Sequence, residues 1–220
     1  LYRLTGESIT DPVNGNYSAV YSYDAVGNRL QSVIDGVTTA YSYDANDRLI
    51  QQGGVTYSYD GQGNTLTETE DGIVIKAYSY NSQQEVVQVV VDDGTSQSTT
   101  IFSYGPDGIR TGKATDGAAT DYTVDYNRDY AQVLREATGS ESVTYTYGDD
   151  LVSQERTLTS ESSFFMYDGL GSTRALTDAL GAISDEYDYE AFGELLNSTG
   201  STENSYLFTG EQYDYSLNQY

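Results

Sequence analysis

Carboxylates are the most abundant groups in this sequence that could act as acids or bases. They stand in close pairs at four places: Asp92/Asp93, Asp149/Asp150, Asp185/Glu186 and Asp188/Glu190. An aspartic dyad needs two carboxyl groups that share one proton at close range. Neighbours in a turn rarely reach that geometry, and charged runs usually form solvated faces. The pairs therefore predict solvated turns, no catalytic residue and no enzymatic activity in this segment.

Other catalytic groups are scarce. Histidine and cysteine are absent, and Lys76 and Lys113 are the only lysines. This composition excludes thiolate nucleophiles, imidazole bases, disulfides and the usual zinc ligands. Neither lysine has SxxK spacing, and the phosphate-binding GxxxxGK[ST] pattern is missing. Calcium is an alternative because Asp-Gly turns are plentiful, but neither an EF-hand loop nor a nine-residue calcium repeat occurs. We predict no cofactor and no metal site.

The charge of the chain limits its partners. The net charge is −24, from 34 acidic and 10 basic residues. Such a surface repels phosphate backbones, so we predict no nucleic-acid partner. The longest apolar run, residues 86–91, is too short to cross a bilayer, and we predict no membrane insertion. The sequence starts at Leu1 and ends in what reads as a strand at Tyr220. We therefore expect a piece of a longer protein.

A tyrosine repeat organises the whole chain. The pattern Tyr-x-Tyr begins at Tyr21, Tyr41, Tyr57 and Tyr78, with 23 tyrosines in the sequence overall. Degenerate copies follow: "FSYGPDG" from Phe102, "YTVDYNRD" from Tyr122, "YTYGDD" from Tyr145, "FMYDGLG" from Phe165, "YDYEAFGE" from Tyr187 and "YDYSLNQY" from Tyr213.

Each copy predicts a β-hairpin. Two tyrosines at i and i+2 share one face of a strand, and their β-branched and aromatic neighbours favour a strand over a helix. The Asp that follows, with a Gly three residues on, is typical of a turn. A second strand such as "NRLQSVI" comes next, and then a second turn at "DGV" or "GGV". Only the segment from Tyr130 resembles a helix, and the next copy at Tyr145 argues against one.

The repeat residues predict a scaffold. Five arginines follow a repeat Tyr or Phe, and we expect each to contact a turn Asp or an aromatic face. Tyrosines of adjacent hairpins should form a ladder of aromatic pairs. We assign structural roles in the repeat to Tyr21, Tyr23, Asp24, Gly27, Arg29, Tyr41, Tyr43, Asp44, Arg48, Tyr57, Tyr59, Asp60, Gly63, Tyr78, Tyr80, Tyr167, Asp168, Gly171, Arg174, Tyr187, Tyr189, Phe192, Gly193, Phe208 and Gly210. Arg110 and Arg128 complete the five arginines.

These motifs resemble a known family. The YxYD units followed by xxGNR resemble the YD repeats of RHS proteins, which include bacterial polymorphic toxins, shell proteins of insecticidal toxin complexes and teneurins. Residues 165–220 resemble the start of the RHS-repeat-associated core, through "YDGLGSTRALTDALG", "YDYEAFGE" and "FTGEQYD". We accordingly expect YD-repeat hairpins over residues 1–160 and a truncated core over residues 161–220.

The resemblance implies an all-β fold, in which repeated hairpins form a spiralling β-sheet ribbon that is part of a hollow shell. In toxin members the shell encloses a C-terminal cargo, and an aspartyl autoprotease at the end of the core releases it. The segment associated with cleavage would follow Tyr220, so no catalytic residue is transferred to this chain.

Three functions remain open on the sequence. The first is a structural shell segment of a secreted or cell-surface bacterial protein, which encapsulates a C-terminal toxin or effector of the same polypeptide; other copies of the chain are a further possible partner. The second is an extracellular adhesin or filament component that binds carbohydrate or surface proteins through tyrosine faces. The third is a part of a self-cleaving aspartyl protease whose catalytic residues lie beyond Tyr220.

Overall fold

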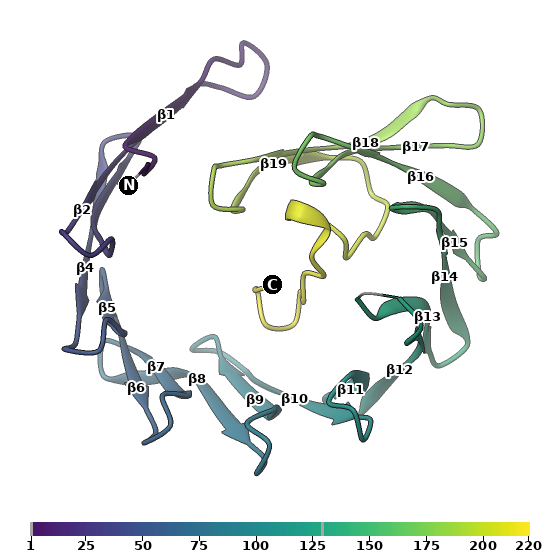
Figure 1. The fold of residues 1–220 in the computed structure, drawn as a ribbon. Helices are drawn as coiled ribbons and strands as arrows, with labels where there is room; N and C mark the ends of the chain where they lie inside the picture. The colour runs from purple at the N-terminus through teal and green to yellow at the C-terminus, as the bar shows by residue number, and fades with distance from the viewer. Residues whose placement is uncertain (1, 129) are drawn as a thin grey trace. The chain divides into compact units, whose positions relative to one another are not determined.

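The computed structural model describes residues 2–128 and 130–220, so Leu1 and Asp129, the last residue of the copy that begins at Tyr122, lie outside it. The described chain is all-β, as predicted (Figure 1). Its strands are β1 (Gly6–Ile9), β2 (Tyr17–Tyr23), β3 (Arg29–Ile34), β4 (Val37–Tyr43), β5 (Leu49–Gln52), β6 (Val55–Tyr59), β7 (Thr65–Glu70), β8 (Ile73–Tyr80), β9 (Val86–Asp92), β10 (Gln97–Tyr104), β11 (Arg110–Thr115), β12 (Ala118–Asp125), β13 (Gln132–Thr138), β14 (Glu141–Tyr147), β15 (Leu151–Arg156), β16 (Ser162–Tyr167), β17 (Thr173–Thr177), β18 (Ile183–Tyr189) and β19 (Leu195–Thr199); a short 3-10 helix, η1 (Phe208–Gly210), follows.

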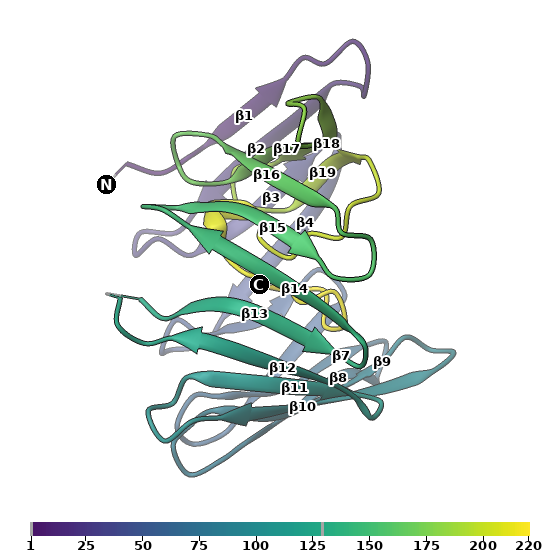
Figure 2. The ribbon, with the colours of Figure 1, turned by 90° about the vertical axis from the view of Figure 1, so that its right-hand side faces the viewer.

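The chain folds as two compact units. Unit 1 comprises residues 1–79 and 90–97, and unit 2 comprises residues 80–89 and 98–220. In unit 1, strands β1 to β8 pair in chain order, each antiparallel to the next. In unit 2, β10 to β19 do the same, and Figure 2 shows these strands side by side. The sequence boundary near residue 160 stays a prediction.

The period-two pattern determines which face of each strand is buried. In β2, Tyr17, Ala19 and Tyr21 are buried, whereas the residues between them are exposed. Tyr17, Ala19 and Tyr21 thus share one face, and Ser18, Val20 and Ser22 share the other, as strand geometry requires. The segment from Tyr130 contains β13 and no helix, so the strand interpretation is confirmed.

Two kinds of turn alternate along the ribbon. The first kind, the Asp-containing turn, follows many of the tyrosine strands and spans five residues; in the first copy the Asp24 N–H donates to the Asn28 carbonyl at 2.9 Å. The second kind is a two-residue hairpin, as at Asp35-Gly36, where both residues have positive φ (47° and 84°). Positive φ at both positions matches the right-handed twist of the flanking strands, and Gly adopts it without strain. The predicted "DGV" and "GGV" turns are confirmed.

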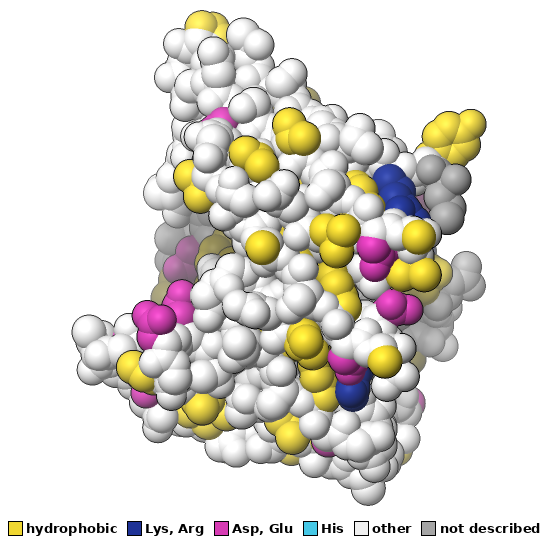
Figure 3. All heavy atoms as spheres, turned by 90° about the vertical axis from the view of Figure 1, so that its left-hand side faces the viewer, with side chains coloured by type: hydrophobic (Ala, Val, Ile, Leu, Met, Phe, Trp, Pro, Cys, Tyr) yellow, Lys and Arg dark blue, Asp and Glu magenta, His cyan; other side chains and the backbone are white. Residues whose placement is uncertain are grey.

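The buried cores differ between the units. Unit 2 has two apolar clusters, one around Tyr145 and Leu151 and another around Leu176 and Tyr189. Most repeat tyrosines of unit 1 are half-buried, although Tyr21 is only 3% exposed. On the side of unit 1 that Figure 3 shows, apolar side chains lie in small groups among polar atoms.

The end of the chain differs from the sequence prediction. Residues 213–220 read as a further strand, but no strand follows β19 in the described chain. Instead, residues 200–220, which we call the C-terminal segment, contain η1 and two isolated bridges, Tyr206↔Gln212 and Asp214↔Gln219. Figures 1 and 2 show this segment against the inner side of the unit 2 strands. The segment forms turns because it packs across the sheet face and does not extend its edge.

Across the described residues, no helix is both long and apolar enough to cross a membrane.

Candidate functional site: the tyrosine face and the C-terminal segment

The second tyrosine of most repeats joins two hairpins. Its hydroxyl donates to a backbone carbonyl at the start of the preceding strand. In unit 1, Tyr43 donates to Arg29 at 3.0 Å and Tyr59 donates to Leu49 at 2.5 Å. The same bond recurs with these partners: Tyr23 to Leu4, Tyr104 to Val86, Tyr147 to Val133, Tyr167 to Leu151 and Tyr189 to Thr173.

A β-bulge explains why this carbonyl needs a partner. Register shifts occur at Tyr23, Tyr43 and Tyr59, just before the Asp-containing turn. A bulge leaves one residue outside the ladder and disrupts the pairing locally. The return strand starts opposite the bulged tyrosine, and its first carbonyl accepts the hydroxyl of the next repeat. Sequence reasoning placed the tyrosines correctly in strands but did not find this bond.

The first tyrosine of a repeat contacts a side chain on the neighbouring strand. Tyr21 donates to Glu7 and Tyr78 to Glu68, both at 2.6 Å. Tyr41 shares a 3.2 Å hydrogen bond with Ser32. The predicted tyrosine pairs therefore lie on one face. The first tyrosine contacts a side chain of the neighbouring strand, and the second donates a hydrogen bond to a backbone carbonyl.

The turn aspartates accept backbone hydrogen bonds. Asp24 Oδ1 accepts from Val26, Gly27 and Asn28 at 2.7–3.0 Å. Asp60 and Asp168 repeat this pattern, and Glu190 replaces Asp in the last such turn. Donation to the carboxylate favours its charged form, so the pKa of Asp60 is lowered, chiefly by the Asn64 side chain. Gly27 and Gly63 have φ of 121° and 96°, which other residues rarely adopt.

The arginines make one or both of the predicted contacts, and Arg48 makes both, since it also lies 4.9 Å from the centre of the Tyr59 ring. Arg48 stands four residues after Asp44 and pairs with it at 2.6 Å, because it occupies the place that Asn28 has in the earlier turn. Arg29 stands one residue later and lies 4.5 Å from the centre of the Tyr41 ring. Arg110 covers Phe102, and Arg174 both covers Tyr189 and pairs with Asp188. Arg128 lies 3.9 Å from Asp125.

Burial raises the pKa of the face tyrosines. Desolvation is the largest cause for Tyr57 and Tyr187, and each pKa is raised to about 12. Their hydroxyls therefore stay protonated at neutral pH. A face of neutral tyrosines can pack against polypeptide and donate hydrogen bonds, but it provides no base or nucleophile.

The C-terminal segment lies on the tyrosine face of unit 2. Tyr206 contacts Tyr145 edge-on, with ring centres 5.0 Å apart, and Leu207 is 1% exposed. The Thr173 hydroxyl donates to the Tyr206 carbonyl at 2.7 Å, and the Thr173 N–H donates to the Leu207 carbonyl. The tyrosine face thus receives a stretch of the same chain that carries aromatic side chains.

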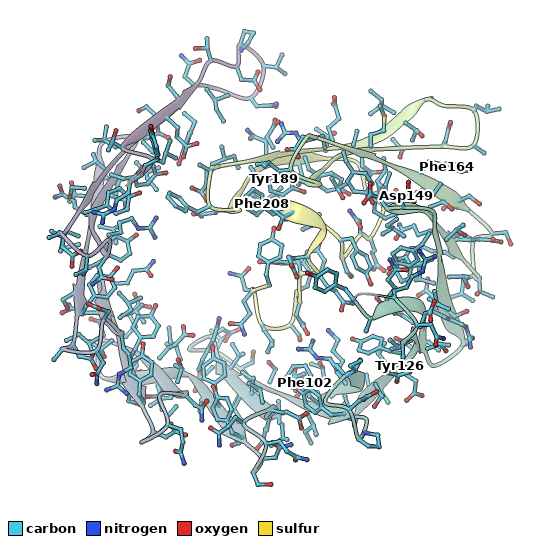
Figure 4. All side chains as sticks on the ribbon, viewed as in Figure 1. Phe102, Tyr126, Asp149, Phe164, Tyr189 and Phe208 are labelled. Atoms are coloured by element: carbon cyan, nitrogen blue, oxygen red, sulfur yellow. The ribbon has the colours of Figure 1, made fainter. Side chains whose placement is uncertain are left out.

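The three core motifs meet at this contact. The ring centres of Phe208 and Tyr189 lie 5.6 Å apart, and Figure 4 shows the two side chains facing each other. Gly193 has no room for a side chain, since a Cβ there would lie 2.6 Å from the Phe208 ring. Gly171 and Gly210 also approach each other closely, with a Gly210 Cβ placed 3.5 Å from the Gly171 carbonyl oxygen. Phe192, by contrast, is 50% exposed.

Polar contacts hold the rest of the segment. Lys113 pairs with Asp214 at 2.8 Å, and Arg156 donates to the Glu203 carbonyl at 2.9 Å. Glu136 accepts from the Tyr145 hydroxyl at 3.1 Å and from Gln212 at 2.9 Å. Burial raises the pKa of Glu136; burial also acts to raise the pKa of Asp214, but hydrogen bonds from Lys113 and Ser216 hold that pKa below its usual value. No sequence signal paired these residues, which are distant along the chain.

The carboxylate pairs do not form a dyad. Asp93 and Asp185 each accept a backbone N–H in a loop, from Ser96 and Thr202 respectively, and Asp188 pairs with Arg174. Within the described residues, no three acidic side chains come close enough to hold a metal ion. Asp93, Asp185 and Asp188 thus make contacts within the fold.

Comparison with known proteins identifies this architecture. A family model described as Teneurin YD-shell matches residues 2–217. The chain belongs to the teneurin YD-shell family. This match confirms the predicted membership in the RHS/YD-repeat group.

Two curated relatives are bacterial. The chain is 30% identical over 213 residues to the tRNA3(Ser)-specific nuclease WapA of Bacillus spizizenii, and 29% identical over 213 residues to the tRNA nuclease WapA of Bacillus subtilis. The alignments cover 94% of this chain but 8% of each relative. The chain thus corresponds to a small part of the length of these relatives.

A solved structure has the same fold. The crystal structure of TcdB2-TccC3-TEV matches with a TM-score of 0.50 and 16% identity, covering 97% of this chain and 15% of that one. The predicted hairpin ribbon of a YD shell is confirmed as the fold.

Proposed function

We propose that this chain is a wall segment of a secreted or cell-surface bacterial YD shell that encloses a C-terminal effector of the same polypeptide. One observation carries the proposal: the tyrosine face of unit 2 already holds a stretch of its own chain, with Leu207 fully covered. A wall that packs against polypeptide on one face suits enclosure. The relatives named as tRNA nucleases support an effector of that broad kind, although the chain spans only 8% of them.

The wall itself needs no reactive group for this function. Its tyrosines remain neutral and its aspartates fold the turns, as described above. The proposal of a self-cleaving aspartyl protease concerns residues beyond Tyr220, so it is tested on the whole protein. The test substitutes aspartates beyond Tyr220 and follows cleavage of the full-length protein.

The carbohydrate-binding alternative receives less support from the geometry. In seven repeats, the hydroxyl of the second tyrosine donates a hydrogen bond to a backbone carbonyl. Those hydroxyls are therefore committed to the fold and do not project toward a sugar. A glycan array with the purified chain tests this alternative directly.

Protease protection in the full-length gene product tests enclosure. We expect the region that follows this chain to resist digestion in the intact protein. Leu176→Asp places a charge in the wall at a fully buried position, and it should open the wall and make that region cleavable. The matched control, Leu180→Asp, changes a residue that is 93% exposed and should preserve protection. Rapid digestion of that region in the unmodified protein would contradict enclosure.

A further inference from the structure

The loop between β1 and β2 contains a pair of residues that can react with each other. This loop spans residues 10–16 and joins Ile9 to Tyr17, which face each other in the strand pair. Figures 1 and 2 show it projecting beyond the two strands at the purple end of the chain. Asn14 and Gly15 are both exposed in this loop, and Asn14 is the only asparagine of the sequence that precedes a glycine.

An asparagine that precedes a glycine can lose its side-chain amide without an enzyme. The Gly15 nitrogen attacks the Asn14 Cγ atom, so that a C–N bond forms. The Cγ–Nδ2 bond breaks, and ammonia leaves with the proton that the Gly15 nitrogen gives up. Water then opens the cyclic imide at either carbonyl; its OH group stays on the new carboxyl group and its hydrogen on the nitrogen. The products are aspartate and isoaspartate, and glycine favours the reaction because no Cβ blocks the approach of its nitrogen.

Asp11 holds both of the reacting groups. Its Oδ2 atom accepts a hydrogen bond from Asn14 Nδ2 at 3.0 Å, and its carbonyl oxygen accepts one from the Gly15 N–H at 3.0 Å. Its Oδ1 atom accepts from the N–H groups of Val13 and Asn14 at 2.7 and 3.0 Å. The attacking nitrogen therefore has its proton in a hydrogen bond, and the amide under attack is tied to a carboxylate.

The charge of Asp11 strengthens this restraint. Hydrogen bonds from the N–H groups of Asn14 and Val13 hold the pKa of Asp11 below its usual value. Asp11 is therefore charged at neutral and alkaline pH, and a charged acceptor makes a stronger hydrogen bond than a neutral one. In the same pH range the Gly15 nitrogen loses its proton most readily. The restraint thus acts under the conditions in which the reaction is otherwise fastest.

Other asparagines lack this combination. Asn28 and Asn64 also donate to a turn aspartate through Nδ2, but larger residues follow them. Asn204 is followed by a small residue, Ser205, yet it is 1% exposed and its side chain is bonded at both ends. The chemistry therefore selects one position in the chain.

We propose that Asn14 is a site of spontaneous deamidation, and that Asp11 slows the reaction by holding the Asn14 amide. The product has a carboxylate in place of the Nδ2 donor, so it loses the hydrogen bond to Asp11 and is repelled by it. Isoaspartate also lengthens the main chain. The loop then holds β1 less firmly against β2, where Glu7 accepts hydrogen bonds from the Tyr17 and Tyr21 hydroxyls.

Incubation of the purified chain at mildly alkaline pH tests the proposal. Mass spectrometry of proteolytic peptides follows the conversion of each asparagine to an acid over time. We expect Asn14 to convert before any other asparagine. Asp11→Ala removes the hydrogen bond to the Asn14 amide, and it should speed the conversion about fivefold, the effect of losing one ordinary hydrogen bond.

Asp93→Ala is the matched control for this substitution. Asp93 accepts from the N–H groups two and three residues ahead of it, as Asp11 does, but its loop contains no asparagine. The control should leave the rate at Asn14 unchanged. Equal Asn14 rates in the two variants, with melting temperatures that show both are folded, would overturn the role of Asp11. Earlier conversion of another asparagine would overturn the site.

A measurement in urea makes the test independent of the variants. Urea removes the loop contacts, so the unmodified chain should convert Asn14 faster in urea than when folded. Equal rates in the two conditions would show that the loop imposes no restraint. Limited proteolysis then tests the consequence: Asn14→Asp should make the loop easier to cleave than Asn16→Asp, which adds the same charge two residues away. Equal cleavage of both would contradict the predicted opening of the loop.

Discussion

At the scale of single residues, half-buried Glu136 links its charge to the stability of the fold. Burial raises its pKa, whereas hydrogen bonds lower the pKa of turn residues such as Asp44 and Asp60. A raised carboxyl pKa means that the folded state binds more protons than the unfolded state just above pH 4.5, so stability falls as pH rises through that window. The turn aspartates act oppositely, since their contribution is lost as pH falls below about 4.

Glu136→Gln should remove the loss of stability above pH 4.5. The amide oxygen that this substitution introduces can still accept from Tyr145 and Gln212, because both bonds reach the same Oε1 atom. Lys113 and Arg156 also act on the native carboxylate, and they limit the size of its shift. We expect urea unfolding between pH 4 and pH 8 to give a flatter stability profile for the variant. Exposed Glu155→Gln is the control, and identical profiles for wild type and E136Q would refute this assignment.

At the scale of elements, the tyrosine-to-carbonyl bond joins successive hairpins. Tyr59→Phe removes the donor to the Leu49 carbonyl and should lower the free energy of unfolding by about 1 kcal/mol. Tyr57→Phe is a matched control in the same strand, because the Tyr57 hydroxyl makes no hydrogen bond to another described residue. We expect it to change stability by less than about 0.5 kcal/mol. Urea titration measures both, and a Tyr57→Phe effect as large as that of Tyr59→Phe would contradict the assigned role.

The same elements show how far the sequence alone could predict the structure. Strands and turns were predictable because period-two tyrosines and Asp-x-x-Gly are local signals. The destination of the Tyr59 hydroxyl was not, since it depends on the bulge and the register of the neighbouring strand. The C-terminal segment misled prediction because Tyr213 and Tyr215 repeat the spacing of a strand, yet contacts with distant residues such as Lys113 determine its path.

At the scale of the whole molecule, the C-terminal segment covers the face that would otherwise be open in unit 2. Leu207→Ala should weaken this docking by about 2–4 kcal/mol, because Leu207 is 1% exposed and truncation leaves a cavity. We expect brief proteolysis to cut within residues 200–220 before it cuts the ribbon. Mass spectrometry of the products identifies the cleavage site. Leu158→Ala changes a residue that is 64% exposed and should leave the digestion pattern unchanged.

Cleavage that starts in the ribbon strands of the Leu207 variant would mean that docking and ribbon unfold together. In that case the segment would be part of the unit 2 core. Preferential cleavage of the segment would instead mark it as a separable layer, the property that a lining against an enclosed polypeptide requires.

The tyrosine-to-carbonyl bonds also follow the order in which the chain is synthesised. In every described case the donor belongs to a later strand and the acceptor to an earlier part of the chain, as when Tyr189 donates to Thr173. A ribosome releases the chain from its N-terminus, and neighbouring repeats supply most of each other's stability. Each emerging hairpin therefore completes the backbone bonding of the one made just before it. Synthesis and folding can advance together along the ribbon, with only the newest hairpin left unfinished.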